Sequence, residues 1–397
     1  MNRESIVVLC TVLAVTSCVE DLTFPPGFLW GAATAAYQVE GGWNANKGES
    51  VWDRLSHEHP EMISDLTNGD VACDSYHLWR RDIEMAEELG LQFYRLSISW
   101  PRLLPSGFPN HISEDGKNYY NNLIDGLLEK GIEPFVTLYH WDLPQSGWTN
   151  HLVADWFVDY ARVAYTLFGD RVKWWITINE PLIICDVVYS SGILAPPIMS
   201  PEVGAHLCSK NVVMAHAKAY RLYDEEFRPK LGNTLIRFIP RSVVGHQHWR
   251  RRWEITIRSK GTFDFYALNQ YTSRLIRPAR EGETFQPWPL GDAIQLNAKM
   301  ERDESWSTTL SFWFFVHPEG IRRQLVWLKQ QYGDIEFVVT ENGRSTQAGL
   351  DDQDRIDYYR KYLRQVRVTN LDFTRSTLKT RCVHALLEPQ RISIQTL

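Results

Sequence analysis

The sequence lacks the patterns that would point to a cofactor, a metal ion or a nucleic acid. It contains no G-x-G-x-x-G or G-x-x-x-x-G-K loop and no C-x-x-C pair, which argues against dinucleotide, P-loop and zinc sites. A net charge of −6 provides no overall basic field to attract nucleic acid. We therefore predict no cofactor, no metal and no nucleic-acid partner.

Long apolar runs are also absent. The most apolar stretch, from Ile6 to Val15, is shorter than the roughly 18 residues that a membrane span requires. One arginine precedes this run, and the small residues Thr16 and Ser17 follow it, an order typical of a secretory signal peptide. We expect residues 1–18 to be such a peptide, the protein to be secreted, and no membrane span to follow.

Cysteine is scarce, with six residues at positions 10, 18, 73, 185, 208 and 382. If the mature chain is secreted, Cys185 and Cys208 could form a disulfide. Free buried thiols are an equally good interpretation of the same two residues. There is also no Asn-x-Ser/Thr sequon, so we predict no N-glycan.

Strand-like apolar runs alternate with longer amphipathic segments along the chain, which predicts a parallel sheet covered by helices. The predicted strands are 28–38, 93–99, 134–140, 174–178, 263–269 and 336–340; the predicted helices are 75–89, 118–130, 153–168, 212–227, 319–332 and 354–366. No repeat or low-complexity tract divides this pattern, so residues 22–366 read as one α/β domain.

Two architectures fit this alternation: a (β/α)8 TIM barrel and a doubly wound open sheet. An open sheet gathers its ligand groups at one switch point, whereas a barrel collects them from many strand ends. Here polar residues follow many different strands, which favours the barrel. They are Gln38, Arg95, His140, Asn179 with Glu180, Asn269 and Glu341.

Two of these strands each end in a glutamate beside an asparagine. "WWITINEPLI" delivers Glu180 and "EFVVTENGRS" delivers Glu341, and a closed barrel would point both side chains at one mouth. A single glutamate at a strand end more often caps the next helix or forms a surface pair. Two such residues suit glycosidic cleavage, in which one carboxylate attacks the anomeric carbon and one carboxylic acid protonates the leaving oxygen.

Five segments in order resemble the signatures of the glycoside hydrolase family 1 β-glucosidases, a family that also includes myrosinase-like and lactase/phlorizin-hydrolase-like members. The segments are "FLWGAATAAYQVEGG" (28–42), "YRLSISWPRLLPSG" (94–107), "LYHWDLPQ" (138–145), "TINEP" (177–181) and "VVTENGRS" (338–345). The similarity covers most of residues 24–228 and 260–366.

The resemblance implies a retaining hydrolysis of terminal β-D-glucosides, with Glu341 as the nucleophile and Glu180 as the acid/base. It also implies that the substrate is a small-molecule or oligosaccharide β-glycoside.

The remaining roles follow from the same resemblance. Gln38, His140 and Asn179 are expected against the sugar hydroxyls. Tyr271 is expected to donate to the nucleophile, while Arg95 lies beneath it and Asn269 supports the site. Trp141 offers a flat apolar face on which a pyranose can pack.

Two parts of the family pattern are not recognisable. Between Lys230 and Gly261 only "NTLIRFI" could serve as a fifth strand, and residues 367–397 show no eighth strand and read as a divergent tail. An incomplete barrel would leave strand edges unpaired. The alternative prediction is therefore a catalytically impaired or non-catalytic saccharide-binding relative. Glycone and aglycone preference and the oligomeric state stay open.

Overall fold

A computed structural model describes residues 23–384, except for segments 145–146, 233–234, 238–260, 287–291, 293–296, 334–335 and 373–379 and positions 348 and 350. The predicted signal peptide, residues 1–18, lies outside the described residues, as does the end of the tail after 384.

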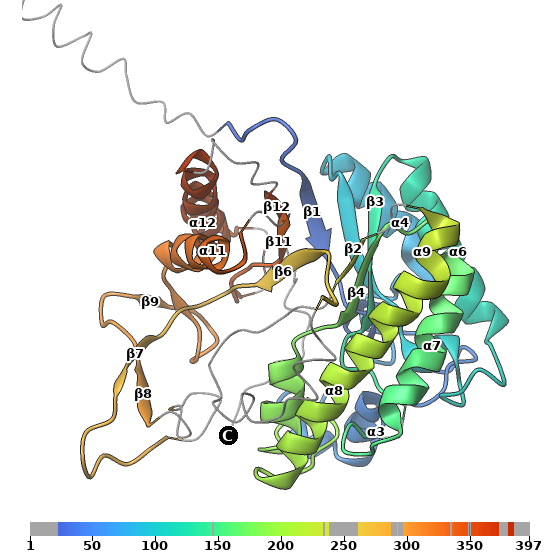
Figure 1. Ribbon diagram of the computed structural model, residues 1–397, viewed down its shortest axis with the longest axis horizontal. Helices are drawn as coiled ribbons and strands as arrows, with labels where there is room; N and C mark the ends of the chain where they lie inside the picture. The colour runs from blue at the N-terminus through green and yellow to red at the C-terminus, as the bar shows by residue number, and fades with distance from the viewer. Residues whose placement is uncertain are drawn as a thin grey trace, which may run out of the picture.

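Eight parallel strands form the central sheet (Figure 1). Their order is β5-β4-β3-β2-β1-β12-β11-β6, and each neighbouring pair is hydrogen-bonded. The strands are β1 (Trp30–Ala33), β2 (Phe93–Ser97), β3 (Glu133–Tyr139), β4 (Trp174–Ile178), β5 (Leu235–Arg237), β6 (Phe265–Asn269), β11 (Glu336–Glu341) and β12 (Thr380–His384).

Helices cover the outside of this sheet in two groups (Figure 1). The long ones are α3 (Val51–Glu58), α4 (Ser75–Glu88), α6 (Glu114–Glu129), α7 (Val153–Phe168), α8 (Val203–Leu222), α11 (Glu319–Tyr332) and α12 (Gln353–Asp372). Short helices are α2 (Ala36–Val39), η1 (Pro60–Met62), α5 (Trp100–Leu103), η2 (Ile183–Val188), η3 (Tyr223–Phe227) and α9 (Arg228–Leu231). Two hairpins, β7 (Leu275–Pro278) with β8 (Ala298–Glu301) and β9 (Ser307–Thr308) with β10 (Phe315–Val316), lie outside the sheet.

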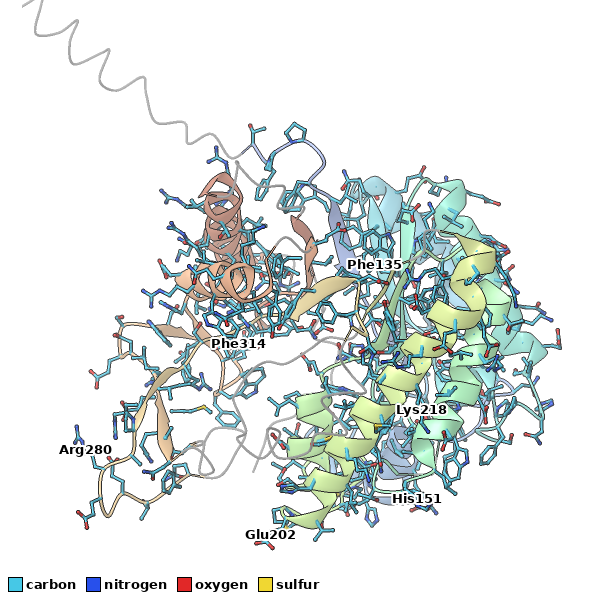
Figure 2. All side chains as sticks on the ribbon, viewed as in Figure 1. Phe135, His151, Glu202, Lys218, Arg280 and Phe314 are labelled. Carbon is cyan, nitrogen blue, oxygen red and sulfur yellow. A yellow bond between two sulfur atoms is a disulfide. The ribbon has the colours of Figure 1, made fainter. Side chains whose placement is uncertain are left out.

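The apolar pattern of the sequence explains these elements. In α7, apolar residues recur on one face, and Phe157, Ala161, Ala164 and Phe168 are buried there against the strands. The strands are apolar on both faces because one face meets helices and the other fills the barrel, where Phe135 stacks on a tryptophan of β4 at 4.7 Å between ring centroids. Figure 2 shows Phe135 among the strands and Phe314 in the part of the molecule that α11 and α12 cover.

The predicted elements agree closely with the observed ones. The helix at 153–168, the strand at 174–178 and the helix at 319–332 match the structure residue for residue. The helix predicted at 212–227 begins nine residues earlier, at Val203. The first predicted strand is only four residues long, because the chain turns into α2 after Ala33.

One prediction about the C-terminal segment is wrong. Residues 367–397 were expected to contain no eighth strand, yet α12 continues to Asp372 and β12 follows at Thr380–His384. β12 pairs in parallel with β11 on one side and β1 on the other. Backbone hydrogen bonds to two neighbouring strands hold β12 in the sheet. Such bonds do not require a particular pattern of side chains, so the sequence did not predict this strand. "NTLIRFI" does supply a fifth strand, although β5 is only three residues long and pairs with β4.

The described strands therefore form a (β/α)8 barrel with one imperfect seam, between β5 and β6. These strands lie side by side, but no hydrogen-bond ladder joins them in the part of the chain that the structure describes. Side chains of α8 and α9 instead reach the start of β6. His216 contacts the Thr262 hydroxyl at 3.1 Å, and Asp264 accepts hydrogen bonds from Tyr220 and Arg228, both at 2.8 Å.

We expect Asp264→Ala to lower the free energy of unfolding by about 2 kcal/mol, because Arg228 and Tyr220 both lose a partly buried charged partner. Denaturant unfolding measures the change. The matched control is Glu226→Ala, which breaks an exposed ion pair with Arg162 and should cost about 0.5 kcal/mol or less. Equal losses in the two variants would show that the side-chain contacts across the seam do not matter.

Candidate active site

The carboxyl ends of the barrel strands bring most of the predicted site residues together. Arg95 projects from β2, Asn179 and Glu180 follow β4, Asn269 ends β6, and Glu341 ends β11. Hydrogen bonds join them in one chain, from Glu341 through Arg95, Asn179 and Asn269 to Glu180. Residues far apart in sequence thus form one polar cluster at the barrel mouth.

Glu341 is buried and held by two donors. Arg95 donates to its Oε1 at 2.5 Å and the Tyr271 hydroxyl donates to its Oε2 at 2.6 Å. Burial opposes ionisation, but the Arg95 charge, the charge of His140 when it is protonated, and these two hydrogen bonds outweigh it and lower the pKa of Glu341 below its ordinary value. Glu341 is therefore an ionised carboxylate over most of the pH range.

Arg95 is fully buried and uses its whole guanidinium to tie four strands together. Besides Glu341 it donates to the Thr137 hydroxyl at 3.0 Å, to the Thr340 carbonyl at 3.1 Å and to Asn179 Oδ1 at 2.8 Å. A buried guanidinium requires this full set of acceptors, because an unpaired buried charge costs several kcal/mol. The sequence analysis did not single out Thr137 or Thr340; Thr340 lies within a signature segment, and Thr137 directly precedes one.

Glu180 has the opposite electrostatic setting. Its Oε1 accepts one hydrogen bond, from Asn269 at 2.8 Å, and no cation contacts it among the described residues. Burial and the negative charge of Glu341 raise the pKa of Glu180 to about 8, although Asn269 and Arg95 oppose the shift. Glu180 is consequently a carboxylic acid at neutral pH. Its backbone lies in the left-handed region, with φ 44°, a strained conformation for this residue type.

Asn179 fixes the state of His140. Asn179 Oδ1 accepts from both Arg95 and Asn269, so its Nδ2 must donate to His140 Nε2, at 3.0 Å. The proton of neutral His140 then sits on Nδ1, which has no partner among the described residues. Burial lowers the pKa of His140 to about 4, and Arg95 adds to the effect while Glu341 opposes it. His140 is thus a neutral imidazole whose Nδ1–H is enclosed within the protein.

Trp141 lies at the edge of this cluster, whereas Gln38 makes no contact with it that the structure records. Trp141 Nε1 donates to the Asn179 carbonyl at 3.3 Å, and its own backbone is left-handed, with φ 79°. Gln38 lies in α2, directly after β1, and its side chain makes no hydrogen bond to the residues that the structure describes. The structure therefore brings Trp141 into the cluster and leaves Gln38 outside it.

A residue that the sequence analysis missed supports the turn after Glu341. Asn342 is buried, and its Nδ2 donates to the Gln270 carbonyl at 2.6 Å and to the Tyr358 hydroxyl at 2.9 Å. Asn342 therefore ties the end of β11 to β6 and α12. Its signal was its place in the Glu–Asn pair, but the pattern could not show that it points away from the cluster.

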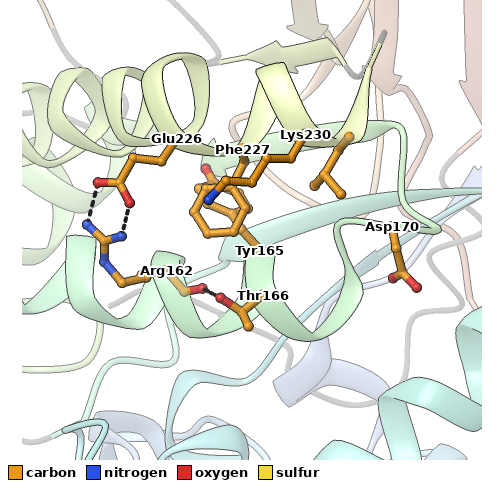
Figure 3. A pocket seen from close by; sticks show the side chains of 8 residues that line it. Arg162, Tyr165, Thr166, Asp170, Glu226, Phe227 and Lys230 are labelled. Atoms are coloured by element: carbon orange, nitrogen blue, oxygen red, sulfur yellow. Dashed lines mark hydrogen bonds and ion pairs between the residues drawn. The ribbon is translucent and has the colours of Figure 1, made fainter.

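A separate groove lies outside the barrel, between α7 and the η3–α9 segment (Figure 3). Arg162, Tyr165, Glu226, Phe227 and Lys230 are among the residues that line it, and none of the predicted site residues does. Arg162 is already paired with Glu226 across the groove. The described residues also contain no cluster of three or more His, Cys, Asp or Glu side chains that could hold a metal ion.

Comparison with known proteins agrees with this geometry. The model of the family described as "Glycosyl hydrolase family 1" matches residues 20–237 and 252–388. The chain belongs to glycosyl hydrolase family 1. The match extends through β12, which the sequence analysis had assigned to a divergent tail, and it is interrupted in the segment after β5.

Individual family 1 relatives show how far the similarity reaches. "Myrosinase 1" of Brevicoryne brassicae is 39% identical over 86% of this chain and 85% of its own length. "Cytosolic beta-glucosidase" of Homo sapiens is 34% identical, over 92% and 90%. The chain is accordingly a β-glycosidase of the O-glycosyl hydrolase class.

Solved structures give the same result. The structure of "Aphid myrosinase" superposes with a TM-score of 0.81 at 36% identity and covers 91% of this chain and 90% of that one. A rice β-glucosidase mutant in a covalent complex with Glc superposes with a TM-score of 0.79 at 26% identity and covers 91% and 90%. These family 1 structures support the TIM-barrel fold for this chain. No described helix has the length and apolar character of a bilayer span.

The coupling between the two carboxyls can be measured directly. Glu341→Gln keeps the shape of the side chain and removes its charge, so we expect the pKa of Glu180 to fall from about 8 by roughly one unit or more. It should stay above the ordinary value, because Glu180 stays partly buried. Carbon-13 NMR titration of side-chain-labelled glutamate provides the measurement, and Glu226→Gln is the control that should leave Glu180 unchanged. A Glu180 pKa unaffected by Glu341→Gln would mean that the two carboxyls do not sense each other.

Proposed function

We propose that this chain hydrolyses terminal β-D-glucosides with retention of configuration, through a glycosyl-enzyme intermediate on Glu341 and with Glu180 as the acid/base. The observation that carries the proposal is the opposite ionisation of two carboxyl groups joined through one hydrogen-bonded cluster. Glu341 is held as a carboxylate by Arg95 and Tyr271, and Glu180 is kept as an acid by burial and by the Glu341 charge. Retaining and inverting glycosidases both require such a divergent pair, and the covalent complex with Glc in a rice family 1 relative favours the retaining mechanism.

The first step uses both residues as they stand. Glu341 attacks the anomeric carbon, the bond from that carbon to the leaving oxygen breaks, and Glu180 transfers its proton to this oxygen. The Glu341 charge disappears when the ester forms, so the pKa of Glu180 falls and Glu180 remains ionised. In the second step Glu180 removes a proton from water, whose oxygen attacks the anomeric carbon from the side that the leaving group vacated. Glu341 then leaves as a carboxylate.

The sugar itself is proposed to bind beside these carboxyls. We expect neutral His140, which is bound to Asn179 beside the two carboxyls, to face a sugar hydroxyl, and the Trp141 ring offers a flat surface for the C–H face of a pyranose. Gln38, which makes no side-chain hydrogen bond to other described residues, is available to a second hydroxyl. A covalent complex with Glc in a rice relative supports the glycosyl-enzyme and the choice of a glucoside.

A second candidate function is saccharide binding without efficient hydrolysis. The seam between β5 and β6 favours it, because Asn269, the hydrogen-bond donor to Glu180, ends β6. A displacement of about one ångström at a reacting group can reduce a rate on the order of 100-fold. The two functions differ in whether Glu341 reacts covalently.

Labelling with a 2-deoxy-2-fluoro-β-glucoside that carries an activated leaving group separates the two functions. We expect one equivalent of label, on the peptide that contains Glu341, by intact-mass and peptide mass spectrometry. Glu341→Gln should take no label. Glu180→Gln should still be labelled, because an activated leaving group departs without a proton. A folded wild-type chain that binds glucosides and takes no label would support the binding-only function.

We also propose that the protein is secreted. The predicted signal peptide suggests this, and a buried Cys185–Cys208 disulfide in the structure supports it, because disulfides persist mainly in oxidising compartments. The bridge joins η2, which closely follows Glu180, to α8. The pairing that the sequence left open is therefore the one observed.

Expression in a eukaryotic secretory host tests the location. The full chain should accumulate in the medium, and its N-terminus should begin near Val19 by mass spectrometry, because residues 1–18 would be removed. A chain that lacks residues 2–18 is the matched control and should remain inside the cells. Retention of both forms would contradict secretion.

A further inference from the structure

Asp142 is a buried carboxyl that the proposed reaction does not use. It follows Trp141 directly and is 1% exposed. Neither of its carboxyl oxygens makes a hydrogen bond of good geometry to a described residue, although the Ser99 hydroxyl lies close enough to interact with the carboxyl group. A pair of unpartnered carboxyl oxygens at this depth is unusual, because buried polar groups in folded proteins are nearly always hydrogen-bonded.

The groups that face Asp142 come from several elements. The groups that influence its charge are the Ser99 hydroxyl before α5, the negative charge of Glu40 at the end of α2, and Lys47. Lys47 is itself bound to Asp53 of α3, and Glu40 is bound to Arg102 and Tyr120. Two buried phenols, Tyr139 and Tyr160, also sense the Asp142 charge. No cation in the described chain is therefore left to pair with Asp142.

The chemistry of this site favours the acid form. An ionised carboxylate that is buried without a partner is costly, whereas a carboxylic acid can donate its own proton to a neighbouring oxygen such as that of Ser99. Burial raises the pKa of Asp142 to about 8, and the Glu40 charge adds to the effect, while Ser99 and Lys47 oppose it. Asp142 thus differs from the acidic residues of the surface.

Asp142 also lies in the strained turn that follows β3. Trp141 has a left-handed backbone with φ 79°, so the turn after β3 is strained and must be held from both sides. On one side, Asn179 binds His140. On the other, the Leu143 carbonyl accepts from Val51 at 2.9 Å, and Ser50 and Pro144 form an isolated bridge. Asp142 lies between these two anchors.

We propose that Asp142 is a positioning residue: in its uncharged form, inserted beside Ser99, it holds the strained turn that presents His140 and Trp141 to the sugar. This role rests on the proposed function, because it assumes that His140 and Trp141 bind the glycone. Asp142 does not touch the reacting atoms. It acts through the backbone of the residues that do.

The proposal predicts a characteristic dependence of stability on pH. The folded state keeps a proton on Asp142 that the unfolded chain releases above its ordinary pKa of about 3.9. This contribution to stability is therefore complete below about pH 4 and is lost as pH rises toward the folded pKa of about 8. Asp142→Asn, which cannot ionise and has nearly the same shape, removes this loss.

The first test compares melting temperatures of wild type and Asp142→Asn at pH 4 and pH 8. We expect the variant to gain on the order of 5 °C more, relative to wild type, at pH 8 than at pH 4. Asp159→Asn, an exposed residue of α7, is the matched control and should show no such difference. A difference between Asp142→Asn and wild type that is independent of pH would overturn the uncharged form. This test needs no substrate, so it stands whether or not the chain hydrolyses glucosides.

The second test uses Asp142→Leu, which keeps the branched shape of the side chain, increases its volume and removes hydrogen bonding. We expect KM for an aryl β-glucoside to rise about tenfold with a smaller effect on kcat, because the turn that binds the sugar is misplaced. Asp142→Asn should restore KM to within about twofold of wild type at pH 6. If the chain proves inactive, the dissociation constant of an iminosugar, followed by tryptophan fluorescence, replaces KM. A folded leucine variant with wild-type affinity would overturn the positioning role.

Discussion

The buried ion pair between Arg95 and Glu341 is the constraint on which the rest of the site depends. A guanidinium with no exposure to water is stable only where acceptors surround it completely, and these acceptors come from β3, β4 and β11. Once Arg95 is satisfied, Glu341 is ionised, Asn179 has a fixed orientation, and His140 has a fixed tautomer. The electrostatic asymmetry of the two carboxyls thus begins with one arginine on β2.

Much of this site could be predicted from the sequence, because the carboxyl ends of all barrel strands meet at one mouth. Glu180, Glu341 and Arg95 each follow or belong to an apolar run, and the closed sheet brings such positions together whatever their separation along the chain. The helices were predictable for a similar reason, because α7 and α11 show their buried faces in the spacing of apolar residues.

Other features left no comparable signal. β12 pairs with its two neighbouring strands through backbone hydrogen bonds. Any short extended segment can make such bonds, so the sequence of β12 shows no strand pattern. Gln38 was expected in the cluster, but its α2 position leaves its side chain without a described partner. Asp142 looked like part of a motif, and only its burial and its unpartnered oxygens set it apart. In each of these cases the three-dimensional surroundings of the residue, and not its type, determined its structural role.

The pairing of β12 with β1 affects when the protein can become functional. β1 lies near the start of the described chain and β12 near its end, so the sheet between them forms only after the ribosome has released residues up to 384. At about 5–20 residues per second, the earlier strands wait for tens of seconds with exposed edges. Glu341 likewise reaches Arg95 late. A nascent chain therefore has no assembled Arg95–Glu341 ion pair until nearly all of the described residues have been synthesised.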